Sequence, residues 1–168
     1  ESTLLHVFPD NDIALEWCEN RLIEQLRTDD DDHKVTLAEH DLCRGLTPNE
    51  VATLESLLKS KTYRSGDLII RKGDPAAEIF LLMSGEVSVR VDLPNGQIKR
   101  LSTLSAGMAF GEIAVINRSM RSADVYADTD VECYLLSTSS FDELGRTYPT
   151  IKMTLLQNLL HNFSRMLK

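Results

Sequence analysis

Residues 110–123 read FGEIAVINRSMRSA, and the rest of the chain is best interpreted outward from this stretch. Residues 113–116 form an apolar run long enough for one or two helical turns, and Gly111 stands at its start. A glycine there lets a ligand approach the backbone, where the first amide groups of a helix have no intrahelical partner. Such a helix start favours an anion, most often a phosphate.

Two charged residues of the same stretch restrict the ligand further. Arg121 carries a planar fork of donors that matches phosphate oxygens. Glu112 would repel a phosphate, so it fits only a different part of the ligand, such as a sugar hydroxyl that donates to the carboxylate. A phosphate held close to a sugar hydroxyl describes a nucleotide with a compact phosphate.

The pattern Phe-Gly-Glu-Ile-Ala, then Arg nine residues after the Glu, then a small residue and Ala, resembles the phosphate-binding cassette of the cyclic nucleotide-binding domain. The resemblance to this family, which includes cAMP receptors and protein kinase A regulatory subunits, extends over about residues 47–168. It implies that Glu112 takes the ribose 2′-hydroxyl and that Arg121 pairs with the cyclic phosphate. The matching positions are Gly111, Glu112, Ile113, Ala114, Arg121, Ser122 and Ala123. By the family's strand positions, the apolar walls for ribose and base are Val89, Leu101 and Phe110, although plain core packing is the simpler role for Phe110.

Two residues depart from the family pattern without removing a contact. Met120 stands where Pro is common, and Ser122 stands where many cAMP binders have Ala. Related domains use Ser or Thr at the second position for both cAMP and cGMP. We expect cAMP in preference to cGMP, because no second polar group for a guanine edge is evident on the strands.

The strand pattern predicts the fold class. Val87, Val89 and Val91 alternate with Ser88 and Arg90, which is the period of a half-buried strand. Asn-Gly at residues 95–96 indicates a tight hairpin. Further β-rich runs between glycine turns lie at residues 68–71, 79–83, 98–104, 123–127 and 131–136. Together they predict a mainly β fold, an antiparallel jelly-roll barrel with N-terminal helices and a C-terminal helix pair.

Helices flank the predicted barrel. Thr47-Pro-Asn-Glu50 is a capping box, and we expect the apolar stripe of its helix at Val51, Leu54, Leu57 and Leu58. Ser139 and Ser140 are expected to cap a short helix around residues 141–144. Pro149 begins a longer helix with an apolar stripe. We expect that helix to pack on the barrel or on a partner, and the second case allows a homodimer. It is also a candidate lid over the base of the nucleotide, with Leu159, Asn162 or Phe163 as the covering residue.

Residues 1–28 are expected to be a piece of a preceding domain. A strand at residues 4–8 and helical spacing from Ala14 to Leu26 resemble the last strand and helix of a STAS domain. STAS and cyclic nucleotide domains occur together in sulfate-permease-like transporters and some bacterial glutaminases; the simpler alternative is a helix packed on the following domain. Residues 29–45 are expected to form an acidic linker and connecting segment, and residues 46–168 the cyclic nucleotide-binding domain. The acids at 29–32 lack the Gly and Glu of a calcium loop.

Composition excludes several function classes. The net charge of −8 argues against nucleic acid as a partner. Three widely spaced cysteines without a Cys-x-x-Cys pair fit a reducing cytoplasm. No apolar run approaches the length of a membrane span, so we expect no direct membrane insertion, and a location at the cytoplasmic face if the parent is a transporter.

An enzyme is the main rival class. A metal-dependent cupin shares a β barrel but needs a cluster of His on its strands, and no His lies in the strand runs. We therefore expect no catalytic residue, metal or cofactor. A transcription factor would continue into a helix-turn-helix, whereas the sequence stops after the long helix. The predicted function is a regulatory domain that binds a cyclic nucleotide and transmits binding through its C-terminal helix to a larger parent protein. The alternative is a structural or dimerising module that binds none.

Overall fold

The computed structural model describes residues 14–15, 17–19, 22 and 33–166. The chain divides into two units, Glu1–Asp32 and His33–Lys168. In the first unit all the described residues are helical, as their spacing predicted. The strand expected at residues 4–8 and the acidic run at 29–32 lie outside the described residues.

The second unit is an antiparallel sandwich of two four-stranded sheets with flanking helices, which confirms the predicted jelly-roll class. One sheet has the order β1-β8-β3-β6 and the other β2-β7-β4-β5. The strands are β1 (Leu58–Tyr63), β2 (Leu68–Ile70), β3 (Glu78–Ser84), β4 (Glu86–Asp92), β5 (Ile98–Ser105), β6 (Ala109–Phe110), β7 (Asp124–Ala127) and β8 (Val131–Ser137). The helical elements are η1 (Leu37–Glu39), η2 (Asp41–Cys43), α2 (Pro48–Glu55), α3 (Glu112–Ile116), α4 (Thr138–Thr147) and α5 (Pro149–Met166).

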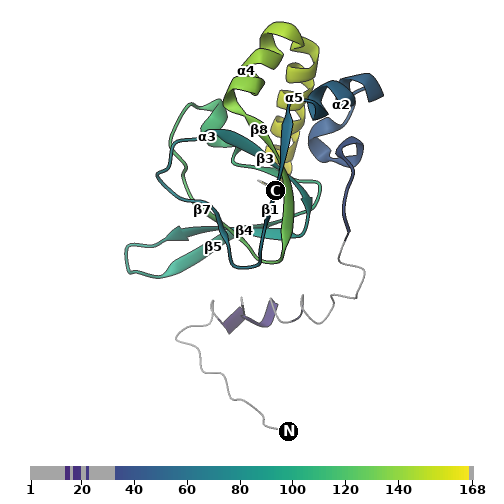
Figure 1. The fold of residues 1–168 in the computed structure, drawn as a ribbon. Coiled ribbons are helices and arrows are strands. Elements are labelled where there is room, and N and C mark those ends of the chain that lie inside the picture. The colour runs from purple at the N-terminus through teal and green to yellow at the C-terminus, as the bar shows by residue number, and fades with distance from the viewer. Residues whose placement is uncertain (1–13, 16, 20–21, 23–32, 167–168) are drawn as a thin grey trace. The chain divides into compact units, whose positions relative to one another are not determined.

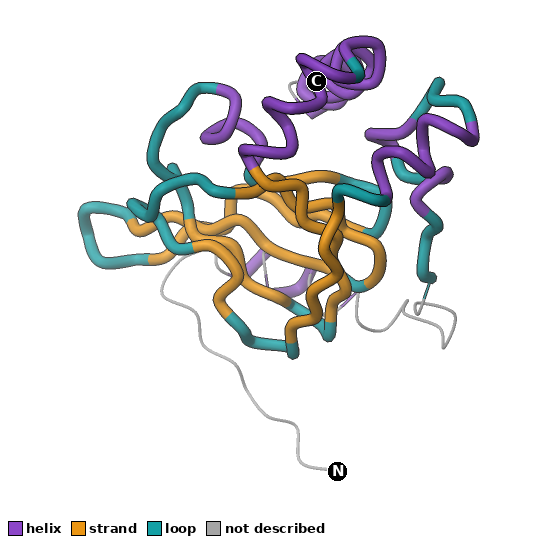
Figure 2. The backbone as a smooth tube through the Cα atoms, turned by 45° about the horizontal axis from the view of Figure 1, so that its top comes forward, coloured by secondary structure: helices purple, strands orange, loops and turns teal. Residues whose placement is uncertain are grey.

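The helices α2, α4 and α5 gather on one side of the sheets, whereas the β4–β5 hairpin lies on the other (Figure 1). Figure 2 shows the same separation from a second direction, with the long helices above the strands. The short helix α3 follows β6 after Gly111. It contacts β3, and its Val115 belongs to the core cluster shared with α2, α4 and α5, so the sheets and the helical layer together place this part of the chain.

Strand β3 explains why the helices pack where they do. Its apolar run is continuous because both of its faces are buried. Ile79, Leu81 and Met83 belong to the core cluster shared with α2, α4 and α5. Phe80 and Leu82 belong to the second cluster, which lies between the two sheets. One strand thus joins the helical layer to the interior of the sandwich.

The N-terminal segment of the second unit is tied to α5 and to the β5–β6 turn. The Asn158 side chain on α5 donates from Nδ2 to the carbonyl oxygens of Leu42 and Arg44, both at 2.8 Å. The buried His40 ring accepts from the Leu42 N–H at Nδ1 (3.1 Å), so its Nε2 carries the proton and donates to the Met108 carbonyl (3.2 Å). Burial lowers the pKa of His40 to about 4, so the ring is neutral at pH 7. Residues 33–45, which the sequence placed in a connecting segment, belong to the folded second unit.

Two local predictions are wrong. The polar strand β1 was not predicted, and Leu58, assigned to the preceding helix, begins it; α2 ends at Glu55. The reason is that β1 is an edge strand whose four central residues are exposed, so it shows no apolar alternation. The cap of α4 is Ser137 rather than Ser139 and Ser140, because the Ser137 hydroxyl accepts from the Ser140 N–H and α4 begins at Thr138.

The capping box at α2 and the proline start of α5 are confirmed. The Thr47 hydroxyl accepts from the Glu50 N–H (3.3 Å), and the Glu50 carboxylate accepts from the Thr47 N–H (2.8 Å). The predicted hairpin at residues 95–96 joins β4 to β5, with Gly96 at φ 78°. These elements follow from local sequence chemistry alone.

We expect Thr47→Ala to lower the free energy of unfolding by about 1 kcal/mol, because it removes a helix N-cap. Urea unfolding followed by circular dichroism measures the change. Thr53→Ala in the same helix is the matched control, since alanine has the higher helix propensity there. Equal stability of the Thr47→Ala variant and the native chain would show that the box does not hold α2.

Candidate functional site

A cavity of about 300 Å³ lies between the α3 region and the sheet β2-β7-β4-β5. The ten residues predicted from the cassette and the strands all line it: Val89, Leu101, Phe110, Gly111, Glu112, Ile113, Ala114, Arg121, Ser122 and Ala123. The cassette residues come from β6, α3 and the turn into β7, and the wall residues Val89 and Leu101 come from β4 and β5. The structure therefore brings the predicted set together around one space.

Gly111 is the N-cap of α3, and it is required by its conformation and by its neighbours. Its φ of 76° lies in the left-handed region, which residues other than glycine adopt only with backbone strain. A Cβ at this position would lie 2.8 Å from Nη1 of Arg121 and 3.1 Å from Cδ1 of Ile70. The glycine therefore leaves room for the Arg121 guanidinium, in addition to the close approach of a ligand that the sequence predicts.

Arg121 is buried, with 6% of its surface exposed. Its Nη1 donates to the Gly111 carbonyl (2.6 Å) and its Nη2 to the Glu78 carbonyl (2.8 Å). These two bonds use two of the five N–H donors of a guanidinium, so three donors remain on a residue that lines the cavity. Burial lowers the pKa of Arg121, and the carboxylates of Glu78, Glu112 and Asp74 oppose that change.

Glu112 is the unsatisfied group of the site. It is 8% exposed, and its Oε2 is buried without a hydrogen-bond partner. Burial raises the pKa of the Glu112 carboxyl, although its own backbone amide and the Arg121 charge act in the opposite direction. A buried oxygen without a partner is costly unless a donor reaches it, so a ligand hydroxyl facing Oε2 fits this position.

The walls of the cavity are mostly apolar. Phe110 stacks on Phe80 with ring centroids 4.9 Å apart and is 2% exposed, so it belongs to the core while one part of it reaches the cavity. Five further lining residues were not predicted from the sequence: Ile70, Ser102, Leu104, Ala109 and Val125. Four of them are apolar strand residues that look like ordinary core. The fifth, Ser102 on β5, supplies the second polar group that the strands were expected to lack.

Of the three lid candidates on α5, only Phe163 lines the cavity. Leu159 is 4% exposed and packs in the cluster beneath the helices instead. Leu101 and Ile113 are about half exposed, at 54% and 47%, although they line the cavity. The cavity is thus open to solvent beside these residues.

Other kinds of site are not found in the part of the chain that the structure describes. No group of three or more His, Cys, Asp or Glu residues is placed to hold a metal ion there. None of the described helices combines the length and the apolar character needed to cross a membrane.

Comparison with known families identifies the arrangement. The model of the cyclic nucleotide-binding domain matches residues 60–148, more than half of the chain. Glutaminase 1 and Glutaminase 2 of Bradyrhizobium diazoefficiens are 39% and 38% identical over 88% and 93% of this chain. The chain spans about a quarter of the length of these glutaminases, at 24% of each. The cAMP-dependent protein kinase regulatory subunit of Colletotrichum orbiculare is 35% identical over 64% of this chain and 27% of its own length.

Solved structures share the fold. A cyclic nucleotide-binding domain from Methylobacillus flagellatus superposes with a TM-score of 0.67 at 27% identity, covering 72% of this chain and 70% of that one. The regulatory subunit of a cAMP-independent protein kinase A from Trypanosoma brucei superposes with a TM-score of 0.61 at 28% identity, covering 79% and 49%. The chain has the fold of cyclic nucleotide-binding regulatory domains.

The buried Glu112 should make stability fall as pH rises. Because its pKa is raised above the ordinary value of 4.5, the folded protein binds more protons than the unfolded chain between 4.5 and the raised value. The stabilisation is complete below 4.5 and is lost as pH rises through the folded pKa. We expect Glu112→Gln to flatten this fall and to be more stable than the native chain at pH 7, as measured by urea unfolding across pH 4–8.

Glu55→Gln, which alters an exposed carboxylate at the end of α2, is the control for this comparison. An identical pH profile for the native chain and the Glu112→Gln variant would contradict the predicted burial of an unpaired carboxylate.

Proposed function

The chain belongs to the cyclic nucleotide-binding domain family, and we propose that it binds a cyclic nucleotide in this cavity as a regulatory domain. The observation that carries the proposal is the pairing of two buried groups with opposite needs. Arg121 has N–H donors left for an anion, and Glu112 has an oxygen left for a donor. A 3′,5′-cyclic nucleotide presents a phosphate and a ribose hydroxyl close together, which satisfies both.

The ligand's phosphate would lie against Arg121 and the residues that follow it. A buried phosphodiester charge needs a partner, and a guanidinium satisfies two oxygens in fixed geometry. Ser122 offers a hydroxyl and Ala123 leaves space beside it. Gly111, Ile113 and Ala114 form the other side of this subsite, and Glu112 accepts from the ribose 2′-hydroxyl.

We propose cAMP in preference to cGMP. Away from the cassette the lining is apolar apart from Ser102. Guanine has more polar edge groups than adenine, and each buried polar group without a partner is costly. The names of the relatives mention both nucleotides. Besides the cAMP-dependent protein kinase regulatory subunit, a cGMP-dependent protein kinase of Plasmodium berghei is 31% identical over 64% of this chain and 12% of its own length.

Helix α5 is the proposed route by which binding reaches the rest of the protein. It contributes Phe163 to the cavity and, through Asn158, holds the carbonyls of the segment that connects to residues 1–32. A ligand shifts this helix only if it binds one arrangement better than another. Contact between Phe163 and the base would provide that difference.

The proposed parent protein is a glutaminase with this domain as one part. The similarity to the two Bradyrhizobium glutaminases covers most of the chain rather than the residues matched by the domain model alone. A transporter is the alternative parent, in line with the STAS-like interpretation of residues 1–28. We also propose a cytoplasmic location and a homodimer through α5. The sequence of the intact parent upstream of Glu1 distinguishes the two parents. A soluble amidohydrolase-like domain would indicate a glutaminase, and about ten membrane spans would indicate a transporter.

A second candidate function is a structural module that binds no cyclic nucleotide. This candidate is supported by the similar Trypanosoma brucei regulatory subunit, which belongs to a protein kinase A described as cAMP-independent. Arg121 and Glu112, buried and partly unpaired, favour binding for the present chain.

Arg121→Ala should weaken cAMP binding by about a hundredfold or more, because each charge-assisted hydrogen bond contributes about 1.5–3 kcal/mol and two are lost. Arg121→Lys should recover part of the affinity, since a point charge cannot form the fork. Glu112→Gln should weaken cAMP binding less than Arg121→Ala does. It should also reduce the preference for a ligand with ribose over one with 2′-deoxyribose. Calorimetric titration with cAMP, after a check of folding, measures all four chains.

Unchanged affinity in the Arg121→Ala chain would place the binding site elsewhere. Absence of binding by the native chain at millimolar cAMP and cGMP would support the structural module instead.

Phe163→Ala should weaken cAMP binding by about three- to tenfold, because it removes apolar surface that covers the ligand. Leu160→Ala is the matched control, since Leu160 lies on the same helix with 69% of its surface exposed. Point substitution is preferable to truncation of α5, which would also remove Asn158 and the buried Leu159. Equal affinity of both variants would limit α5 to packing.

A further inference from the structure

The charges that line the cavity balance only while it holds no anion. Among the described residues, Arg121 and Glu112 are the charged side chains of the lining, and the rest of the lining is apolar or small, with two serine hydroxyls. One guanidinium therefore faces one carboxylate. A cyclic nucleotide brings one further negative charge with its phosphodiester, so the occupied cavity would hold two anions against one cation.

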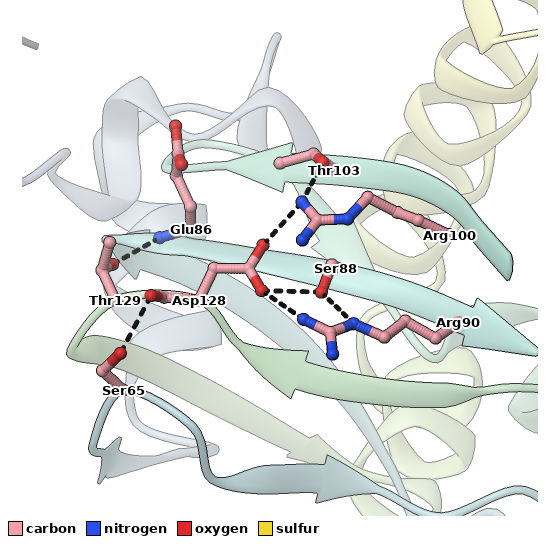
Figure 3. Close-up of polar contacts among 8 residues, drawn as sticks. All are labelled: Ser65, Glu86, Ser88, Arg90, Arg100, Thr103, Asp128 and Thr129. Carbon is pink, nitrogen blue, oxygen red and sulfur yellow. Dashed lines mark hydrogen bonds and ion pairs between the residues drawn. The ribbon is translucent and has the colours of Figure 1, made fainter. Parts of the chain in front are cut away.

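Two more arginines belong to the sheet that forms the cavity wall, but they are bonded elsewhere (Figure 3). Arg90 on β4 donates to Oδ1 of Asp128 (3.0 Å), and Arg100 on β5 donates to Oδ2 (3.2 Å). The buried Ser88 also donates to Oδ1, at 2.7 Å, and these four residues form the Asp128 cluster. Neither arginine lines the cavity, so Arg121 is the cation that meets a bound phosphate.

The positive charge of Arg121 is already shared among acidic side chains. The carboxylates of Glu78 on β3 and of Asp74 in the turn before it act on the guanidinium, as does Glu112. The charged side chain that acts on Glu112 in turn is Arg121. Backbone amides at the start of α3 offer dipoles to a phosphate but no net charge. The surroundings of the cavity therefore hold no spare positive charge for a second anion.

Glu112 is the group that can remove the imbalance. It is 8% exposed, its Oε2 is buried without a hydrogen-bond partner, and burial raises the pKa of the carboxyl before any ligand arrives. A phosphate anion in the same cavity opposes the ionised carboxylate further, because like charges disfavour each other. The ribose hydroxyl favours the carboxylate by donating to it, but one hydrogen bond offsets less than the burial of an unpaired charge costs.

We propose that the site binds a cyclic nucleotide with Glu112 as the neutral acid, so that binding takes up a proton from solvent. The inference rests on the proposed cyclic nucleotide binding and adds its regulation by pH. A neutral carboxyl still serves the ligand, since its carbonyl oxygen accepts from the ribose hydroxyl and its O–H donates to a ligand oxygen. The proton comes from water, and no bond of the ligand breaks.

The direction of the pH dependence follows from linkage. Between the Glu112 pKa of the empty site and the higher pKa of the occupied site, the complex binds more protons than the free protein. Affinity for the nucleotide therefore falls as pH rises through this window, by up to about tenfold per pH unit, and is constant outside it. The domain then responds to cyclic nucleotide and to acidity together.

The test is calorimetric titration of the native 168-residue chain with cAMP from pH 5 to pH 8, at each pH in two buffers that differ in ionisation enthalpy. The difference in heat gives the number of protons exchanged. We expect uptake of up to one proton per bound ligand, and a dissociation constant about tenfold or more higher at pH 8 than at pH 5.

Glu112→Gln, which is neutral at every pH, should show no such uptake, and its dissociation constant should change by less than about twofold over the same range. Glu55→Gln, which alters an exposed carboxylate, should behave as the native chain does. The histidines, which titrate in this range, are present in all three chains, so the comparison isolates Glu112.

Infrared difference spectra of the native chain with and without cAMP supply a second readout that needs no variant. The carbonyl band of a protonated carboxyl should appear on binding, which decides the question even if Glu112→Gln fails to fold or bind. Binding by the native chain without proton uptake, or with proton release, would overturn the inference. So would a Glu112→Gln chain that keeps the native pH dependence. Failure of the native chain to bind at any pH would instead refute the proposed function, so the two results are distinguishable.

Discussion

The burial of one guanidinium determines the geometry of the candidate site. Arg121 joins the turn before β7 to the Gly111 carbonyl at the start of α3 and to the Glu78 carbonyl on β3. A buried charge must be paired and hydrogen-bonded, and here backbone carbonyls and three nearby carboxylates supply that environment. Gly111 must be a glycine because a Cβ would occupy the space of the guanidinium. The arginine, the glycine and the glutamate of the cassette therefore depend on one another within the protein, before any ligand is considered.

The sandwich holds this arrangement from two sides. Strand β3 is buried on both faces, so the carbonyl of Glu78 is placed by packing against the helices and between the sheets. The opposite wall of the cavity is placed by β4, β5 and β7, whose outer face carries the Asp128 cluster. That cluster is partly buried, so its charge-assisted bonds lose less to solvent than exposed ion pairs do.

The sequence was sufficient for the features that depend on local chemistry. The capping box at Thr47, the proline start of α5, the glycine at residue 111 and the alternating valines of β4 are each encoded by adjacent residues. Features that depend on pairing between strands distant in the sequence could not be predicted from adjacent residues. Strand β1 is polar and exists because β8 offers it an edge, and β6 is two residues long and pairs with β3. Ser102 looks like an outward residue until the register shift at Leu101 is known.

The same division applies to helix α5 and its proposed coupling to the ligand. The sequence left three lid candidates because an apolar stripe does not reveal which of its members faces a cavity. In the structure Phe163 lines the cavity, whereas Leu159 is buried in the core. Asn158 and Phe163 are five residues apart, which separates them by about 140° around the axis of α5. The cavity and the segment held by Asn158 therefore lie on different sides of one helix. In the proposed coupling, a rigid shift of α5 that brings Phe163 onto a ligand would change the distances from Asn158 to the Leu42 and Arg44 carbonyls. Because hydrogen bonds depend steeply on geometry, these two bonds are the contacts through which such a shift would reach residues 42–44.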